Sequence, residues 1–156
     1  MDSPQPDPPR ATARGGHTLW PTQVAAPSAE LHRRAWAVIS DVLRNGAPED
    51  RAFAAQMLGR IEAPEAVRLL CEALRSRASS VRAAAANAFR TTRQPVPTNV
   101  LAASLRNETD PWRRVLLVEA IARSADPQRG QMIRPAFRDP DKLVRLIAYS
   151  QIWRLP

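Results

Sequence analysis

Arginine is the residue type in this chain whose number and spacing point to chemistry. The 156 residues carry 23 basic side chains against 15 acidic ones, a formal net charge of +8, and Lys142 is the only lysine. The planar guanidinium group pairs with carboxylates and phosphates through two parallel hydrogen bonds. These residues therefore offer recognition of anions, which nucleic acid, anionic lipid or an acidic protein would supply. A basic excess also arises without a partner, from a GC-rich genome or from arginines that offset helix dipoles.

The arginines recur at offsets of 31 or 32 residues, a period that marks a stack of supersecondary units. Three columns of equivalent arginines result, and we name each by its first member. The Arg51 column is Arg51, Arg82, Arg114 and Arg145; the Arg44 column is Arg44, Arg75, Arg106 and Arg138; the Arg60 column is Arg60, Arg123 and Arg154, with Arg90 and Arg93 flanking a gap at Thr91.

No other residues form a catalytic or metal-binding pattern. His17 and His32 are the only histidines, and the single Cys71 stands in an apolar helical run, where a small buried hydrophobe is expected. Neither a nucleophile with a nearby base nor a glycine-rich phosphate loop is visible. We therefore predict no catalytic residue, no metal site and no cofactor. One cysteine excludes an internal disulfide, and no apolar run reaches about 18 residues, so we expect a cytoplasmic protein without a membrane span.

Helical spacing of apolar residues, together with start and stop signals, predicts eight helices. Ser28 is the expected N-cap of the first, and Asn45-Gly46 the expected left-handed stop. Aspartate-proline pairs at 110–111, 126–127 and 139–140 are expected to begin the last three. The expected helices cover about 29–44, 48–60, 64–76, 79–92, 97–107, 111–124, 127–138 and 140 to near the C-terminus.

The repeat groups these helices into four pairs. Apolar residues of equivalent helices correspond, as Leu58, Phe89, Ile121 and Ile152 do, and alanines recur in the second helices. This pattern predicts an all-α fold, an α-solenoid of four stacked antiparallel helix pairs over residues 28–156. Residues 1–27 hold six prolines and are expected to be a disordered tail. Within it, Leu19-Trp20-Pro21 is either a stray apolar segment or a docking motif.

With this repeat pattern, residues 29–156 resemble HEAT-like repeats, the short bacterial kind often grouped with phycobilisome-lyase-type repeats. The resemblance lies in an arginine followed by small and apolar residues. The third unit departs from it by an extra residue before Arg114, and only the fourth pair has a first-helix proline, Pro135. The best-matching stretches are Val81-Arg82 with Ala85, Ala86, Ala88 and Phe89, and Val144-Arg145 with Ala148 and Ile152.

The resemblance implies roles for the arginine columns. The Arg51 column is expected to be a structural ladder that pairs with carbonyls or with acidic residues in the turns. The Arg60 column, with Arg90 and Arg93, is expected on the concave face, where it is the best candidate for an anionic partner. The Arg44 column is expected to offset helix dipoles. Candidate acidic ladder partners are Glu49, Asp110, Asp139 and Asp141.

The last helix is apolar almost all round, although repeat stacks normally end on a polar face. Ile147, Tyr149 and Trp153 are therefore candidate anchors for a partner or for a second copy of the chain. The leading hypothesis is a non-catalytic scaffold or assembly subunit that binds another, acidic protein or itself. The alternatives are a nucleic-acid-binding module that uses the same arginines, and a lyase or chaperone for a tetrapyrrole-carrying protein.

Overall fold

The structure is a computed structural model that describes residues 28–154. This part of the chain is all-α, with eight α-helices, two short 3-10 helices and no strand. The predicted tail over residues 1–27, with Leu19-Trp20-Pro21, lies outside the described residues. The elements are α1 (Ala29–Asn45), α2 (Pro48–Leu58), α3 (Pro64–Ala73), α4 (Ser79–Thr91), α5 (Thr98–Asn107), α6 (Pro111–Arg123), α7 (Arg129–Ile133), η1 (Arg134–Arg138), α8 (Lys142–Ser150) and η2 (Ile152–Arg154).

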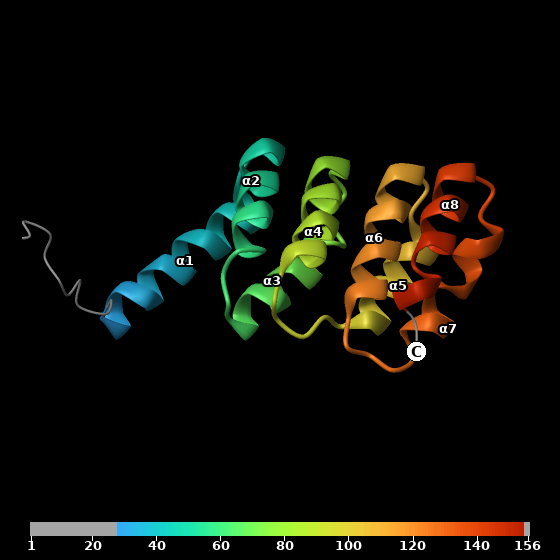
Figure 1. Cartoon of the computed structure of the whole chain (residues 1–156). Coiled ribbons are helices and arrows are strands. Elements are labelled where there is room, and N and C mark those ends of the chain that lie inside the picture. Colours follow the sequence, from blue (N-terminus) through green and yellow to red (C-terminus); the bar gives the residue numbers. More distant parts are fainter. Residues whose placement is uncertain (1–27, 155–156) are drawn as a thin grey trace, which may run out of the picture.

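The helices form two layers of a stack, which confirms the predicted α-solenoid (Figure 1). The second helices α2, α4, α6 and α8 stand in one row, and each packs extensively on the next. The first helices contact one another much less, and α1 projects from the stack (Figure 1). The second helices are therefore the more closely packed layer of the stack.

Several helix starts follow the sequence signals. Ser28 caps α1 by accepting a hydrogen bond from the Leu31 N–H at 3.2 Å, and Asp110 caps α6 by accepting one from the Arg113 N–H at 2.9 Å. Proline occupies the first turn of α2, α3 and α6, where its missing N–H costs nothing. Short capping segments between the helices therefore fix where these helices begin.

Several helix boundaries differ from the prediction. Gly46 is not left-handed but extended, with φ −69° and ψ 168°. Asp139 does not cap the eighth helix, since Arg114 and the Asp141 N–H occupy its carboxylate; Asp141 is the cap. The seventh helix begins at Arg129, later than Asp126-Pro127 predicted, and continues past Ile133 as the 3-10 helix η1.

Pro135 explains the change at Ile133, since its ring removes a backbone donor that an α-helix needs. The second and third helices end at Leu58 and Ala73, two and three residues earlier than predicted. The last helix ends at Ser150, and the 3-10 helix η2 follows it.

Small residues let the second helices approach closely. Gly59 at the end of α2 is buried, and a Cβ built on it would lie 2.8 Å from the Ala88 Cβ and 2.9 Å from the Ala88 Cα. Its backbone is ordinary right-handed helix, so closeness to α4, not conformational freedom, requires glycine here.

Gly59→Ala is expected to lower the free energy of unfolding by about 1–3 kcal/mol, because α2 and α4 must separate to admit the methyl group. Urea denaturation measures the change. Ala88→Gly in the same chain removes one of the two clashing atoms and should recover part of the loss. Two variants whose effects simply add would show that the two positions do not compete for space.

Candidate functional site

The Arg51 column links each unit of the stack to the next. Arg51 donates from Nε to the Leu43 carbonyl at 2.9 Å and from Nη2 to Ser76 Oγ, in the following unit, at 3.2 Å. Arg82 donates from Nη1 to the Ser76 and Arg77 carbonyls of its own turn, each at 3.0 Å. Its Nε donates to Glu108 of the following unit at 3.1 Å.

Arg114 repeats this two-sided geometry. Its Nη1 donates to the carbonyls of Glu108 and Thr109, and its Nε and Nη2 donate to the Asp139 carboxylate, both at 2.8 Å. The accepting side chain in the following unit always comes six residues before the column arginine of that unit. This acceptor position holds Asn45, Ser76, Glu108 and Asp139 in the four units.

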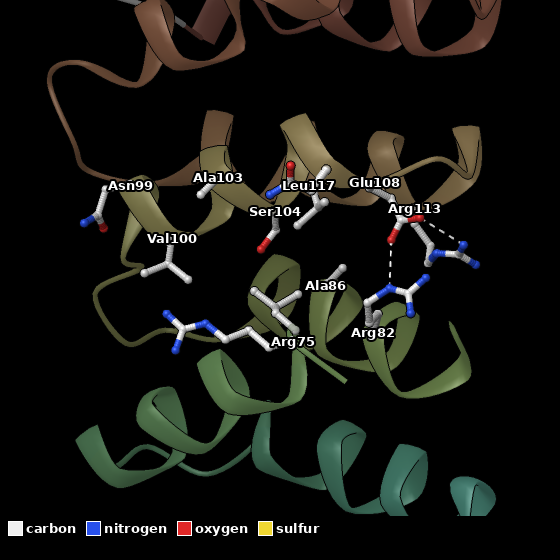
Figure 2. Close-up of a pocket in the computed structure, with 12 residues that line it drawn as sticks. Arg75, Arg82, Ala86, Asn99, Val100, Ala103, Ser104, Glu108, Arg113 and Leu117 are labelled. Carbon is white, nitrogen blue, oxygen red and sulfur yellow. Dashed lines mark hydrogen bonds and ion pairs between the residues drawn. The ribbon is translucent and has the colours of Figure 1, made fainter. Parts of the chain in front are cut away.

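Glu108 is the most tightly held acceptor (Figure 2). Its side chain is only 5% exposed; Arg82 and Arg113 pair with it at 3.1 and 2.9 Å, and the N–H groups of Thr109 and Asp110 donate to it at 3.0 and 3.1 Å. Burial by itself raises the pKa of Glu108, but the hydrogen bonds from Arg113, the Asp110 N–H and Arg82 outweigh it and lower the pKa from 4.5 to about 2.

Sequence reasoning missed Glu108 and Arg113. It named Asp110 as a ladder partner, whereas Asp110 caps α6 and approaches Arg113 at 3.7 Å. The acceptor position holds a different residue type in each unit, so no pattern in the sequence marks Glu108. A groove of about 410 Å³ borders this cluster, and Arg75 of the Arg44 column points into it (Figure 2).

The Arg60 column lies at the C-terminal ends of the second helices and lines two adjoining hollows. Arg60 and Arg93 line one of about 300 Å³; Arg90, Arg93 and Arg123 line the other, of about 850 Å³. The side chain of Arg154 lies outside the described part. The structure thus brings four of the five predicted arginines to one continuous surface.

Carboxylates occupy part of this surface. Arg90 pairs with Glu119 at 3.2 Å, and Arg93 with Glu62 at 3.5 Å in an exposed bridge. Arg60 and Arg123 are exposed, and no acidic side chain within residues 28–154 pairs with either. These two guanidinium groups are therefore open to an anion from outside.

The Arg44 column does more than offset dipoles at its first position. Arg44 forms a bidentate ion pair with Glu72 of the next unit, with a shortest contact of 2.9 Å. Arg68 also contacts the Glu72 carboxylate, at 3.1 Å. Both pairs are largely exposed, so their contribution to stability is small.

The C-terminal end of the stack exposes large apolar side chains. Trp153 is 91% exposed, and Tyr149 is exposed while its ring lies 5.1 Å from that of Phe137. Ile147 is half-buried and packs against the core. Leu146, 64% exposed, faces solvent in its place.

The paired helices, their period and the arginine that links each unit to the next define a HEAT-type α-solenoid. The family model of HEAT repeats matches residues 37–122, more than half of the chain, and the chain belongs to this family. No curated protein matches it.

Neither a metal-binding cluster nor a membrane-spanning helix is present among the described residues. Between residues 28 and 154, no three histidine, cysteine or acidic side chains gather closely enough to hold a metal ion. Across the same residues, no helix combines the length and apolarity that crossing a membrane requires. Burial raises the pKa of the Cys71 thiol, in keeping with a structural cysteine.

Proposed function

We propose that this chain is a non-catalytic scaffold that binds an acidic segment of another protein along the Arg60 column. HEAT repeats generally serve as scaffolds for protein–protein interaction. The observation that carries the proposal is that Arg60 and Arg123, without acidic partners within residues 28–154, flank two joined hollows at the C-terminal ends of the second helices. Guanidinium groups spaced along such a surface suit successive carboxylates of one chain.

The interleaved carboxylates favour protein over nucleic acid as the partner. Glu62 lines the smaller hollow, and Glu119 pairs with Arg90 beside the larger one. A phosphate backbone offers only negative charge and would meet repulsion from both carboxylates. A protein segment carries donors as well as acceptors, so it satisfies both signs of charge on this surface.

A double charge reversal tests the proposal. Isolation of the native complex from the source cells is expected to give a stoichiometric protein partner that cross-links to residues beside the hollows. Arg60→Glu with Arg123→Glu should weaken that complex by about 100-fold or more, since each reversal replaces an attraction with a repulsion. Isothermal titration with the purified partner measures the loss.

The matched control makes the same change of charge elsewhere. Arg106→Glu with Arg75→Glu alters two exposed arginines, one in the last turn of α5 and one just after α3, and should leave the affinity within a few-fold of the original. Equal losses from both pairs would mean that only net charge matters. Copurification of nucleic acid instead, with affinity falling steeply as salt rises, would replace the proposal by the nucleic-acid alternative.

A further inference from the structure

The ladder of the Arg51 column has an open edge in the last described unit. Arg145 donates from Nη1 to the carbonyls of Asp139 and Pro140 at 2.7 and 2.9 Å, as Arg114 does to its own turn. No residue between 28 and 154 accepts a hydrogen bond from its Nε or Nη2. In Arg114 those same two nitrogens hold the carboxylate of the next unit. Arg145 therefore presents the donor side of a junction between units.

Burial at equivalent positions shows which side chains such a junction covers. Tyr149 is 53% exposed and Ile152 is 43% exposed. Both line a hollow of about 600 Å³ together with Arg134 and Arg138. The equivalent residues of the three preceding units are at most 1% exposed. They are Ala55, Ala86 and Val118 for Tyr149, and Leu58, Phe89 and Ile121 for Ile152.

The opposite end of the stack exposes the complementary side of a junction. Phe53 is 64% and Met57 39% exposed on α2. Asn45 occupies the acceptor position there; its Nδ2 donates to Asp41, which leaves its Oδ1 open to a donor. The equivalents of Phe53 and Met57 in the second and third units are at most 5% exposed: Ala84, Leu116, Ala88 and Ala120.

The charges at the two ends are also complementary. Asp41, Glu49 and Asp50 are exposed at the α1–α2 end, and none of them pairs with a basic side chain within the described residues. The other end carries Arg134, Arg138 and Lys142, all exposed. One acidic and one basic end favour head-to-tail approach and disfavour like ends.

We propose that a second copy of this chain docks head to tail, its α1–α2 end covering Tyr149, Ile152 and the open edge of Arg145. Asn45 of the second copy then takes the place that Asp139 takes beside Arg114. A head-to-tail contact uses two different surfaces and leaves one of each exposed, so it extends into open chains unless rotation closes a ring. The proposal does not depend on the Arg60 column, whose hollows are lined by other residues.

Complementation between two variants tests this arrangement. In sedimentation equilibrium, the weight-average mass of the full chain is expected to rise with concentration beyond that of a dimer. Tyr149→Glu destroys one surface and Phe53→Glu the other, so each variant alone should be monomeric. An equimolar mixture should form a dimer and stop there, because each partner retains one working surface. Ile152→Glu, which spares the contact between Tyr149 and Phe137, should behave as Tyr149→Glu does.

A matched control and a gain of affinity complete the test. Trp112→Glu changes a side chain that is 59% exposed on α6, away from both ends, and should leave association unchanged. Asn45→Asp places a carboxylate opposite Arg145 and should tighten association about fivefold to tenfold. Three results would overturn the proposal: a wild-type monomer at every concentration, a mixture that stays monomeric, or association lost with Tyr149→Glu but kept with Phe53→Glu.

Discussion

Glu108→Ala is expected to lower the free energy of unfolding by about 3–5 kcal/mol, the range for removing one partner of a buried ion pair. The carboxylate is 5% exposed and accepts hydrogen bonds from Arg82, Arg113 and two backbone N–H groups. Its removal leaves two partly buried guanidinium groups without that carboxylate. Chemical denaturation followed by circular dichroism measures the loss.

Glu72→Ala is the matched control for this variant. Glu72 also pairs with two arginines, Arg44 and Arg68, but its side chain is 39% exposed. Water replaces the lost contacts at such a site, so the expected cost is at most about 1 kcal/mol. A Glu108→Ala variant no less stable than Glu72→Ala would contradict the prediction.

Glu108→Gln separates charge from packing through its dependence on pH. The folded-state pKa of Glu108, about 2, lies below its ordinary value of 4.5, so the folded state favours the ionised form. That preference amounts to about 3 kcal/mol of stability, fully present above pH 4.5 and lost as the pH falls toward 2. The difference in stability between wild type and Glu108→Gln should therefore shrink over this window. A difference that stays constant between pH 6 and 2.5 would count against it.

The role of Glu108, which the sequence did not predict, shows what the sequence could and could not predict. The period of 31 or 32 residues, with apolar spacing and proline-containing starts, was enough to predict the four helix pairs. The acceptor position was invisible because it conserves a role and not a residue type: amide, hydroxyl and carboxylate oxygens fill it in Asn45, Ser76, Glu108 and Asp139. Only the geometry of each arginine, reaching both its own turn and the next, defines the position.

The C-terminal helix shows a second limit. An apolar pattern that surrounds a helix does not distinguish the side that packs from the side that faces solvent. In α8, Val144 and Ala148 are fully buried and Ile147 follows them inward, while Leu146 and Tyr149 face out. Those directions follow from the position of α6, which the sequence of α8 alone does not contain.

Phe89→Ala is expected to lower the free energy of unfolding by about 3–5 kcal/mol, because it leaves a cavity in a closely packed stack. Phe89 is 1% exposed on α4, between α2 and α6. Each unit of a repeat stack is stabilised mainly by its neighbours, so a weak junction at α4 separates the units on either side. Hydrogen exchange should therefore rise first in α4 and in the faces of α2 and α6 that contact it.

Ile152→Ala provides the comparison at the same position of the last unit. Ile152 is 43% exposed, so truncating it in the monomer is expected to cost less than about 1 kcal/mol. If a second copy covers this end, the cost should grow with protein concentration, whereas the cost of Phe89→Ala should not. Equal costs for the two variants in dilute protein would mean that the last unit is already covered, and would remove the physical basis for treating its end as an open junction.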